Sequence, residues 1–191
     1  MSFEDRLKTG RFGERIIDEF LRQKGWIPYR PIEGAAHPFD RLAASPNKRK
    51  LCIVEVKTKW RREAYADTGI DRRHYNDYQH VTTTYRVPLF LCFVDAKLGT
   101  VYGNWWAELL KPREPEDSWA GGCEGYPWEQ HGIVYFPLSA MRKLYVLTEQ
   151  DRGELRGLRV SGWTEPTPVP EPQPTFEFTA ITDKDINWNF R

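Results

Sequence analysis

The sequence has few cysteines, few histidines and no long apolar run. Its 191 residues include three cysteines and four histidines, and no two cysteines form a C-x-x-C pair. This spacing argues against a structural zinc site, and free cysteines inside apolar runs indicate a reducing compartment. No run approaches the roughly 18 apolar residues of a membrane span, and the charged N-terminus lacks the apolar core of a signal peptide. We therefore expect a soluble, cytoplasmic protein without a membrane partner.

Length and composition favour one domain with extensions. Hydrophobic residues make up 40% of the chain and aromatic residues 14%, which is enough for one well-packed core and too little for two large ones. We place the folded domain at residues 1–150 and a Pro-rich linker with an aromatic, acidic C-terminal tail at residues 151–191. The alternating prolines of SGWTEPTPVPEPQPT are typical of an extended linker.

Charge is unevenly distributed along the chain. Residues 1–90 hold 18 Lys and Arg against 12 Asp and Glu, whereas residues 91–191 hold 10 against 15. A basic field is expected of a protein that binds a polyanion, but an ordinary solvated surface produces the same imbalance.

Apolar spacing predicts two amphipathic helices. In TGRFGERIIDEFLRQKGW the apolar side chains recur at helical spacing, and Gly25 stands where a helix C-cap favours glycine. Glu14 falls on the border of this apolar face, which allows its side chain to face a cleft. The second helix is predicted from Thr68 by a stripe of five residues, Ile70, His74, Tyr78, Val81 and Tyr85.

The remaining patterned segments predict strands. WIPYRPI and the region around HPFDRLAAS are short extended pieces, and KLCIVEVKTKW is a strand rich in β-branched residues. VPLFLCFVDA predicts a buried strand, GTVYGNWW its hairpin partner, residues 107–131 a loop or lid, and IVYFPLSAMRKLYVL a strand leading into a short helix. The order α-β-β-β-α-β-β predicts an α/β fold with a mixed sheet flanked by helices.

The strand IVEVK holds charges at positions where a buried strand is apolar. Its period of two places Ile53, Glu55 and Lys57 on one face and only apolar side chains on the other. Burying a carboxylate or an ammonium is costly unless the group is paired or binds something, so the placement indicates a chemical function.

Asp40 supplies a second carboxylate at a spacing that permits an adjacent strand. If Asp40 and Glu55 lie side by side, their charges repel unless a cation lies between them. Oxygen ligation suits Mg²⁺ or Mn²⁺, which proteins bind through one or two carboxylates together with phosphate and water. Lys57 would then stabilise a phosphate oxygen, or orient or deprotonate the attacking water, as in metal-assisted phosphodiester hydrolysis.

These residues carry a family resemblance. Glu14 in GERIIDEF, Asp40 in HPFD and Glu55-Val56-Lys57 in IVEVKTK, in this order and on these element types, resemble the PD-(D/E)XK nuclease superfamily. The first helix is similar to that of Holliday-junction-resolvase-like members. The resemblance implies a restriction-endonuclease-like fold with an α-β-β-β-α-β core.

The resemblance also implies roles for individual residues. Asp40 and Glu55 would be metal ligands, Val56 a ligand through its backbone carbonyl, and Glu14 an outer or second-metal ligand. Lys57 would be the catalytic cation. The implied cofactor is Mg²⁺ or Mn²⁺, the implied partner is DNA, and such nucleases frequently act as homodimers.

A set of basic residues stands near the ends of the central strand, where their side chains would bind DNA phosphates. They are Lys48, Arg49, Lys50, Lys59, Arg61 and Arg62.

The resemblance covers residues 9–95 and favours a metal-dependent DNA endonuclease, a deoxyribonuclease that is structure-directed or weakly sequence-specific. The alternative is a catalytically inactive module of the same fold that binds nucleic acid, or a protein partner through the C-terminal tail. A metal-free structural protein is the third hypothesis. Each site residue also has an ordinary explanation: a turn aspartate at Asp40, an ion pair between Glu55 and Lys57 on a half-exposed edge strand, and a solvated helix residue at Glu14.

Overall fold

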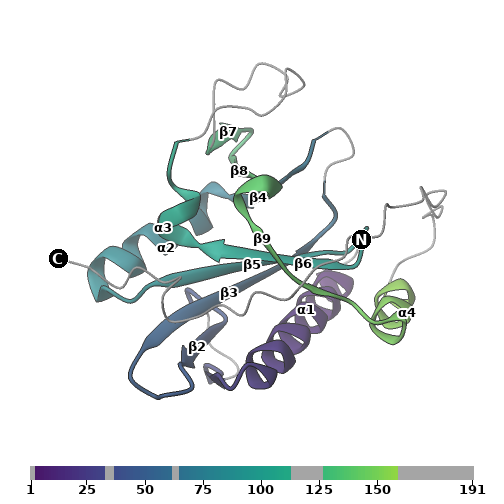
Figure 1. Cartoon of the computed structure of the whole chain (residues 1–191). Helices are drawn as coiled ribbons and strands as arrows, with labels where there is room; N and C mark the ends of the chain where they lie inside the picture. The colour runs from purple at the N-terminus through teal and green to yellow at the C-terminus, as the bar shows by residue number, and fades with distance from the viewer. Residues whose placement is uncertain (1–2, 33–36, 62–64, 113–126, 159–191) are drawn as a thin grey trace. The chain divides into compact units, whose positions relative to one another are not determined.

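The computed structural model describes residues 3–32, 37–61, 65–112 and 127–158. Within these ranges the chain forms a six-stranded mixed sheet, a three-stranded antiparallel sheet and helices (Figure 1). The fold class predicted from the sequence, an α/β fold with a mixed sheet flanked by helices, is confirmed.

The larger sheet has the strand order β1-β2-β3-β5-β6-β9. Its strands are β1 (Ile27–Tyr29), β2 (Arg41–Ala44), β3 (Leu51–Lys59), β5 (Leu89–Asp95), β6 (Thr100–Trp105) and β9 (Arg142–Val146). The β3–β5 pair is parallel and the other neighbours are antiparallel. A parallel pair needs a crossover connection, and helix α2 (Arg72–Tyr85) lies in this one.

The remaining elements in the described part of the chain are a second, smaller sheet, three further helices and a 3-10 turn. The smaller sheet has the order β4-β8-β7. The elements are α1 (Phe3–Gln23), β4 (Asp67–Asp71), α3 (Trp106–Leu109), β7 (Trp128–Gln130), β8 (Ile133–Pro137), the 3-10 turn η1 (Leu138–Ala140) and α4 (Glu149–Gly157).

Helix α1 approaches β3 closely at a glycine. A Cβ atom on Gly13 would lie 1.8 Å from the side-chain oxygen of Thr58 and 3.4 Å from a methyl carbon of Val56, so only glycine fits without a shift. This contact places Glu14, the next residue, beside the sheet. The helix ends as predicted, with Gly25 at φ +76° and the Trp26 N–H donating to the Leu21 carbonyl.

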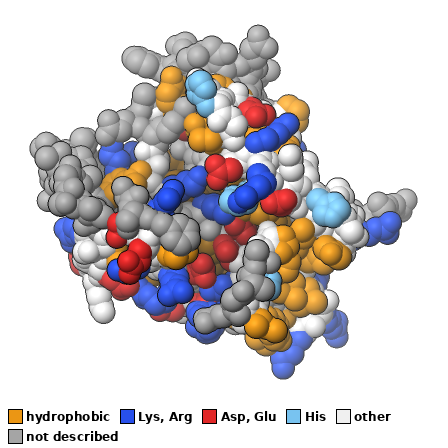
Figure 2. Space-filling view, turned by 180° about the vertical axis from the view of Figure 1, so that it is seen from behind, with side chains coloured by type: hydrophobic (Ala, Val, Ile, Leu, Met, Phe, Trp, Pro, Cys, Tyr) orange, Lys and Arg blue, Asp and Glu red, His pale blue; other side chains and the backbone are white. Residues whose placement is uncertain are grey.

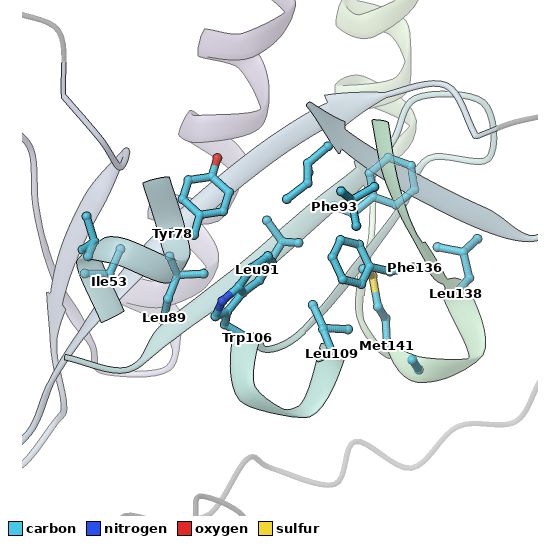
Figure 3. Close-up of a cluster of buried hydrophobic side chains, with 14 residues drawn as sticks. Ile53, Tyr78, Leu89, Leu91, Phe93, Trp106, Leu109, Phe136, Leu138 and Met141 are labelled. Carbon is cyan, nitrogen blue, oxygen red and sulfur yellow. The ribbon is translucent and has the colours of Figure 1, made fainter. Parts of the chain in front are cut away.

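Alternate residues of β3 and β5 enter two apolar layers. Val54 and Val56 lie on the α1 side, whereas Ile53 joins a buried cluster beneath α2, α3 and β8 (Figure 3). Tyr78 of α2 stands at the edge of this cluster, and Figure 3 shows its hydroxyl directed away from the labelled apolar side chains. The Ile53, Glu55 and Lys57 face of β3 is therefore also covered, by α2.

Three details of the sequence prediction are wrong. The second helix begins at Arg72, because Asp67–Asp71 pairs with the distant strand β8 as β4, and Ile70 lies in that strand. Tyr85 is 65% exposed and so is not part of the apolar stripe. The segment after β8 forms a single 3-10 turn and then β9, whose pairing with β6 outweighs the local helical pattern.

The prediction of a loop at residues 107–131 is wrong at both ends, because α3 runs to Leu109 and Trp128–Gln130 pairs with β8 as β7; residues 113–126 lie outside the described part. Helix α4 spans residue 150, where the sequence places the domain boundary, and the chain divides into compact units at Met1–Ser161 and Gly162–Arg191. Residues 151–157, predicted as the start of the Pro-rich linker, belong to α4, and residues 159–191 lie beyond the described residues. Among the helices described, none is long and apolar enough to cross a membrane.

Candidate functional site

The carboxylates of Asp40 and Glu55 meet where β2 begins beside β3. In the β2–β3 register Arg41 stands opposite Val54, which brings Asp40 next to Glu55. The Asp40 N–H donates to Glu55 Oε2 at 3.2 Å, and the Val56 N–H donates to Asp40 Oδ2 at 2.8 Å. Each of the two carboxylates therefore accepts a hydrogen bond from a backbone N–H, and these bonds hold the two acids side by side.

Glu55 is almost completely buried, with 3% of its surface exposed. The hydroxyl of Tyr78 donates to its Oε1 at 2.6 Å, and Lys57 Nζ lies 2.7 Å from the same oxygen. Together with the Asp40 N–H, these donors hold both oxygens of the carboxylate in a fixed orientation.

Tyr78 is a site residue that the sequence analysis assigned only to the core. Its ring packs at right angles to Trp106, with 5.6 Å between ring centroids, and Lys57 Nζ lies 5.9 Å from the ring centroid. The helical stripe was a sign that Tyr78 faces the sheet, but only the register of α2 against β3 shows that its hydroxyl reaches Glu55.

The environment of Asp40 disfavours its charge. Burial, the nearby charge of Glu55 and, more weakly, that of Glu14 raise the pKa of Asp40 to about 7, against the lowering effect of the Val56 N–H and Lys57. A carboxyl group whose pKa is raised by burial and by a like charge is often found where a cation binds.

Glu14 lies near this pair but is bound elsewhere. Arg41 Nη2 donates to Glu14 Oε2 at 2.9 Å, and Arg41 Nε donates to Asp18 Oδ1 at 2.8 Å. Asp18, which is 1% exposed, also accepts from the guanidinium of Arg30. Arg41 and Asp18 were not predicted from the sequence. Each is a charged residue inside a segment of otherwise apolar pattern, and this placement was the sign that could have identified them.

The donors available for a divalent ion are all oxygens. The carboxylates of Asp40 and Glu55 and the carbonyl of Val56 are the set that the sequence predicts, and oxygen donors of this kind suit Mg²⁺ or Mn²⁺. Among the described residues, no group of three or more His, Cys, Asp and Glu side chains could hold a metal ion together. Two carboxylates still suffice, because Mg²⁺ usually keeps several waters.

The structure divides the predicted DNA-binding residues into two groups. Lys48, Arg49 and Lys50 lie in or beside the turn before β3, whereas Lys59 and Arg61 lie at its other end. At about 3.3 Å per residue, the nine-residue strand separates the groups by roughly 30 Å. Arg62 is outside the described residues.

The two cations at the far end of β3 also have protein partners. Lys59 Nζ donates to the Gly69 carbonyl at 2.9 Å, and burial and the charge of Lys57 lower the pKa of Lys59 despite the opposing charge of Asp71. Arg61 Nε lies 3.7 Å from the buried Asp95 carboxylate.

Further basic side chains begin α2. Arg72 and Arg73 are exposed in its first turn, where the helix dipole disfavours cations, and His74 follows with its ring stacked on Tyr78 at 6.1 Å. On the face drawn in Figure 2, acidic and basic side chains gather close together near the centre, beside an apolar area.

Known proteins resemble parts of the chain. No family model matches it. A UPF0102 protein of Koribacter versatilis (strain Ellin345) is 35% identical over 83 residues, which cover 42% of this chain and 58% of the relative. The chain thus spans less than two thirds of that relative's length.

A Holliday junction resolvase from the archaeal hyperthermophile Archaeoglobus fulgidus is a similar solved structure, with a TM-score of 0.45 and 13% identity over 69% of this chain and 90% of that one. Within the chain itself, α1, β1, β2, β3, α2 and β5 follow one another in the predicted order, with β4 inserted before α2. The chain therefore has the core element order that its resemblance to the PD-(D/E)XK superfamily implies.

Proposed function

We propose that the chain is a metal-dependent DNA endonuclease that hydrolyses phosphodiester bonds and is structure-directed or weakly sequence-specific. The observation that carries the proposal is the meeting of Asp40 and Glu55 at the start of β2, with Lys57 2.7 Å from Glu55 Oε1. DNA as the substrate rests on the resemblance of the sequence motifs.

The metal would be held by Asp40, Glu55 and the Val56 carbonyl. Among the described residues, no hydrogen bond reaches Asp40 Oδ1, and Oδ2 accepts from the Val56 N–H. When bound, Mg²⁺ or Mn²⁺ supplies a Lewis acid for the phosphodiester and lowers the pKa of a water molecule. Burial and, after it, the charge of Glu55 raise the pKa of Asp40, and a bound cation would offset both effects by stabilising the ionised carboxylate.

The chain's own residues position and neutralise the reacting groups. The side chain of Lys57 is partly exposed, at 19%, and its ammonium would contact a substrate phosphate while it pairs with Glu55. Tyr78 and the Asp40 N–H hold Glu55 in one orientation, which reduces the reorganisation needed when substrate binds.

Basic side chains would hold the DNA backbone on both sides of this centre. Lys59, Arg61, Arg72 and Arg73 lie toward one end of β3 and the start of α2, and the turn Lys48–Lys50 lies at the other end of β3. Such contacts fix the position of a duplex without reading its sequence. A homodimer, and a protein partner for the C-terminal tail, remain predictions.

The experiment is a paired binding and cleavage assay on the full chain. A panel of linear, flapped and four-way-junction DNAs is incubated in Ca²⁺, analysed by filter binding, and then transferred to Mg²⁺ or Mn²⁺ and analysed on a gel. We expect DNA bound but uncut in Ca²⁺ and cleaved after the exchange. Binding without cleavage of any of these DNAs in any divalent ion would instead favour the inactive module, and no binding to any of them would contradict DNA as the substrate.

A further inference from the structure

Glu14 and the Glu55–Lys57 pair are separated by the sheet. Residues directly opposite each other in an antiparallel pair project to the same face, so Arg41 shares the face of Val54, which is the α1 side. Glu55 and Lys57 alternate with Val54 and lie on the α2 side, where Tyr78 reaches Glu55. Arg41 and Glu14 therefore meet behind the metal-binding pair.

Arg41 uses four of its five guanidinium N–H groups on this side. Nε and Nη2 donate to Asp18, Nη2 also donates to Glu14 Oε2, and Nη1 donates to the Asp40 carbonyl at 2.7 Å. The side chain is 5% exposed, so water does not replace these bonds easily. Burial lowers the pKa of Arg41, but its hydrogen bonds to Asp18 and Glu14 and the charges of these two residues raise the pKa above its ordinary value.

The balance of charge limits how many ions the site accepts. The four carboxylates of Glu14, Asp18, Asp40 and Glu55 face three cations, Arg30, Arg41 and Lys57. With every group charged, the cluster carries one negative charge, which one divalent ion changes to one positive charge. A second ion would leave three positive charges in a largely buried cluster.

We infer that the site takes a single divalent ion, between Asp40 and Glu55, and that the Arg41 guanidinium stands in the place of a second cation at Glu14. Glu14 is then a ligand of Arg41 and not of the metal. Arg41 already binds Glu14 Oε2, so a second ion at Glu14 would have only Oε1 and would lie beside the positive charge of a nearly buried guanidinium.

In this arrangement Arg41 is a positioning residue. Its bond to the Asp40 carbonyl fixes the backbone that carries one metal ligand, and its bond to Glu14 joins α1 to the start of β2. This inference rests on the proposed function, because it concerns the metal site of the nuclease.

The test is isothermal titration of Mn²⁺ into the metal-free full chain and into three variants, with Mn²⁺ electron paramagnetic resonance on the same samples. Glu14→Gln removes the charge but keeps an oxygen for Arg41, and Glu55→Gln removes a proposed ligand. Glu19→Gln is the matched control, because Glu19 lies on the same helix and, within the described ranges, forms an ion pair only with Arg15 at the surface.

We expect one Mn²⁺ per chain in the wild type and a mononuclear resonance spectrum. Glu14→Gln and Glu19→Gln should each change Kd by less than about threefold, and Glu55→Gln should weaken binding by about a hundredfold or more. Two ions per chain, or a tenfold weakening in Glu14→Gln, would overturn the single-ion inference while leaving the proposed function standing. No Mn²⁺ binding to the wild type would overturn both.

Discussion

Two pairs of acidic residues lie near each other in this protein, Glu14 with Asp18 and Asp40 with Glu55. Their negative charges are neutralised in different ways. Glu14 and Asp18 receive two arginines, Arg30 and Arg41, at hydrogen-bonding distance. Asp40 and Glu55 share one ammonium and are otherwise held by neutral N–H and O–H donors.

The difference distinguishes a structural acid pair from a candidate metal site. An arginine fork satisfies a buried carboxylate permanently, since its charge and geometry match both oxygens. The Asp40 and Glu55 pair lacks such a partner, and the raised pKa of Asp40 shows the cost. A rigidly held pair of carboxylates with too few positive partners is where a divalent ion would stabilise the fold, and this pair is the metal site that we propose.

The largest effect should come from neutralising either acid of the candidate metal site. We expect Asp40→Asn and Glu55→Gln each to reduce cleavage in Mg²⁺ by about a thousandfold or more, because each removes a ligand of the catalytic ion. Single-turnover cleavage of the DNA panel measures the loss. The control is Glu4→Gln on α1, a surface residue with 78% side-chain exposure, which should cleave normally. Full activity in either acid variant would remove these residues from the catalytic assignment.

A smaller loss should follow from removing the lysine beside Glu55. If its ammonium acts on one phosphate in the transition state, as we propose, Lys57→Ala should reduce turnover by about a hundredfold while DNA affinity changes by less than about threefold. Turnover and affinity are measured separately, by single-turnover cleavage in Mg²⁺ and filter binding in Ca²⁺. Equal losses in both would make Lys57 a binding residue.

The pH dependence of the free energy of unfolding tests the unfavourable charge of Asp40 without any metal. The folded pKa of Asp40 is about 7, above its unfolded value of about 3.9, so the folded state loses stability as pH rises between these values. In EDTA, Asp40→Asn should therefore be more stable than the wild type, with a gain that grows from pH 4 to pH 7 and then levels off. After allowance for solvent screening, the gain at pH 8 is on the order of 2 kcal/mol.

Urea unfolding at a series of pH values measures this gain. Glu4→Gln serves again as the control and should show no comparable dependence, because its carboxylate is at the surface. A gain in Asp40→Asn that does not change with pH would show that the charge of Asp40 is not its source.

The smallest effect should come from the hydroxyl that orients Glu55. Tyr78→Phe leaves a buried carboxylate oxygen with one donor fewer, which costs about 1–3 kcal/mol of stability and weakens Mn²⁺ binding by about tenfold. Tyr75→Phe is the matched control, because Tyr75 lies on the same helix and packs against the same Trp106. If the two variants have equal stability and equal Mn²⁺ affinity, the Tyr78 hydroxyl does not position Glu55.

The sequence was sufficient to predict the contacts that depend on local periodicity. The period of two in IVEVK placed Glu55 and Lys57 on one face, and a single turn between strands brought Asp40 beside them. Contacts set by long-range register were not predictable in this way. Tyr78 resembles any core aromatic until α2 is docked on β3, and β4 pairs with a strand more than 60 residues later.

The pairing of Arg41 with Asp18, on the α1 side of the sheet, is another long-range contact that local sequence patterns could not predict. Asp18 and Arg41 are 23 residues apart, on a helix and a strand, and neither element's own pattern indicates that the two side chains meet. Glu14 was predicted as a metal ligand from the resemblance, and its bond to Arg41 became visible only in the folded structure.

The most direct test of the difference between the two acidic pairs is anomalous diffraction from crystals of the full chain grown with Mn²⁺. We expect one anomalous peak between the carboxylates of Asp40 and Glu55, with Arg41 still bound to Glu14 and Asp18. A peak between Glu14 and Asp18, or no peak at Asp40 and Glu55 at saturating Mn²⁺, would contradict this expectation.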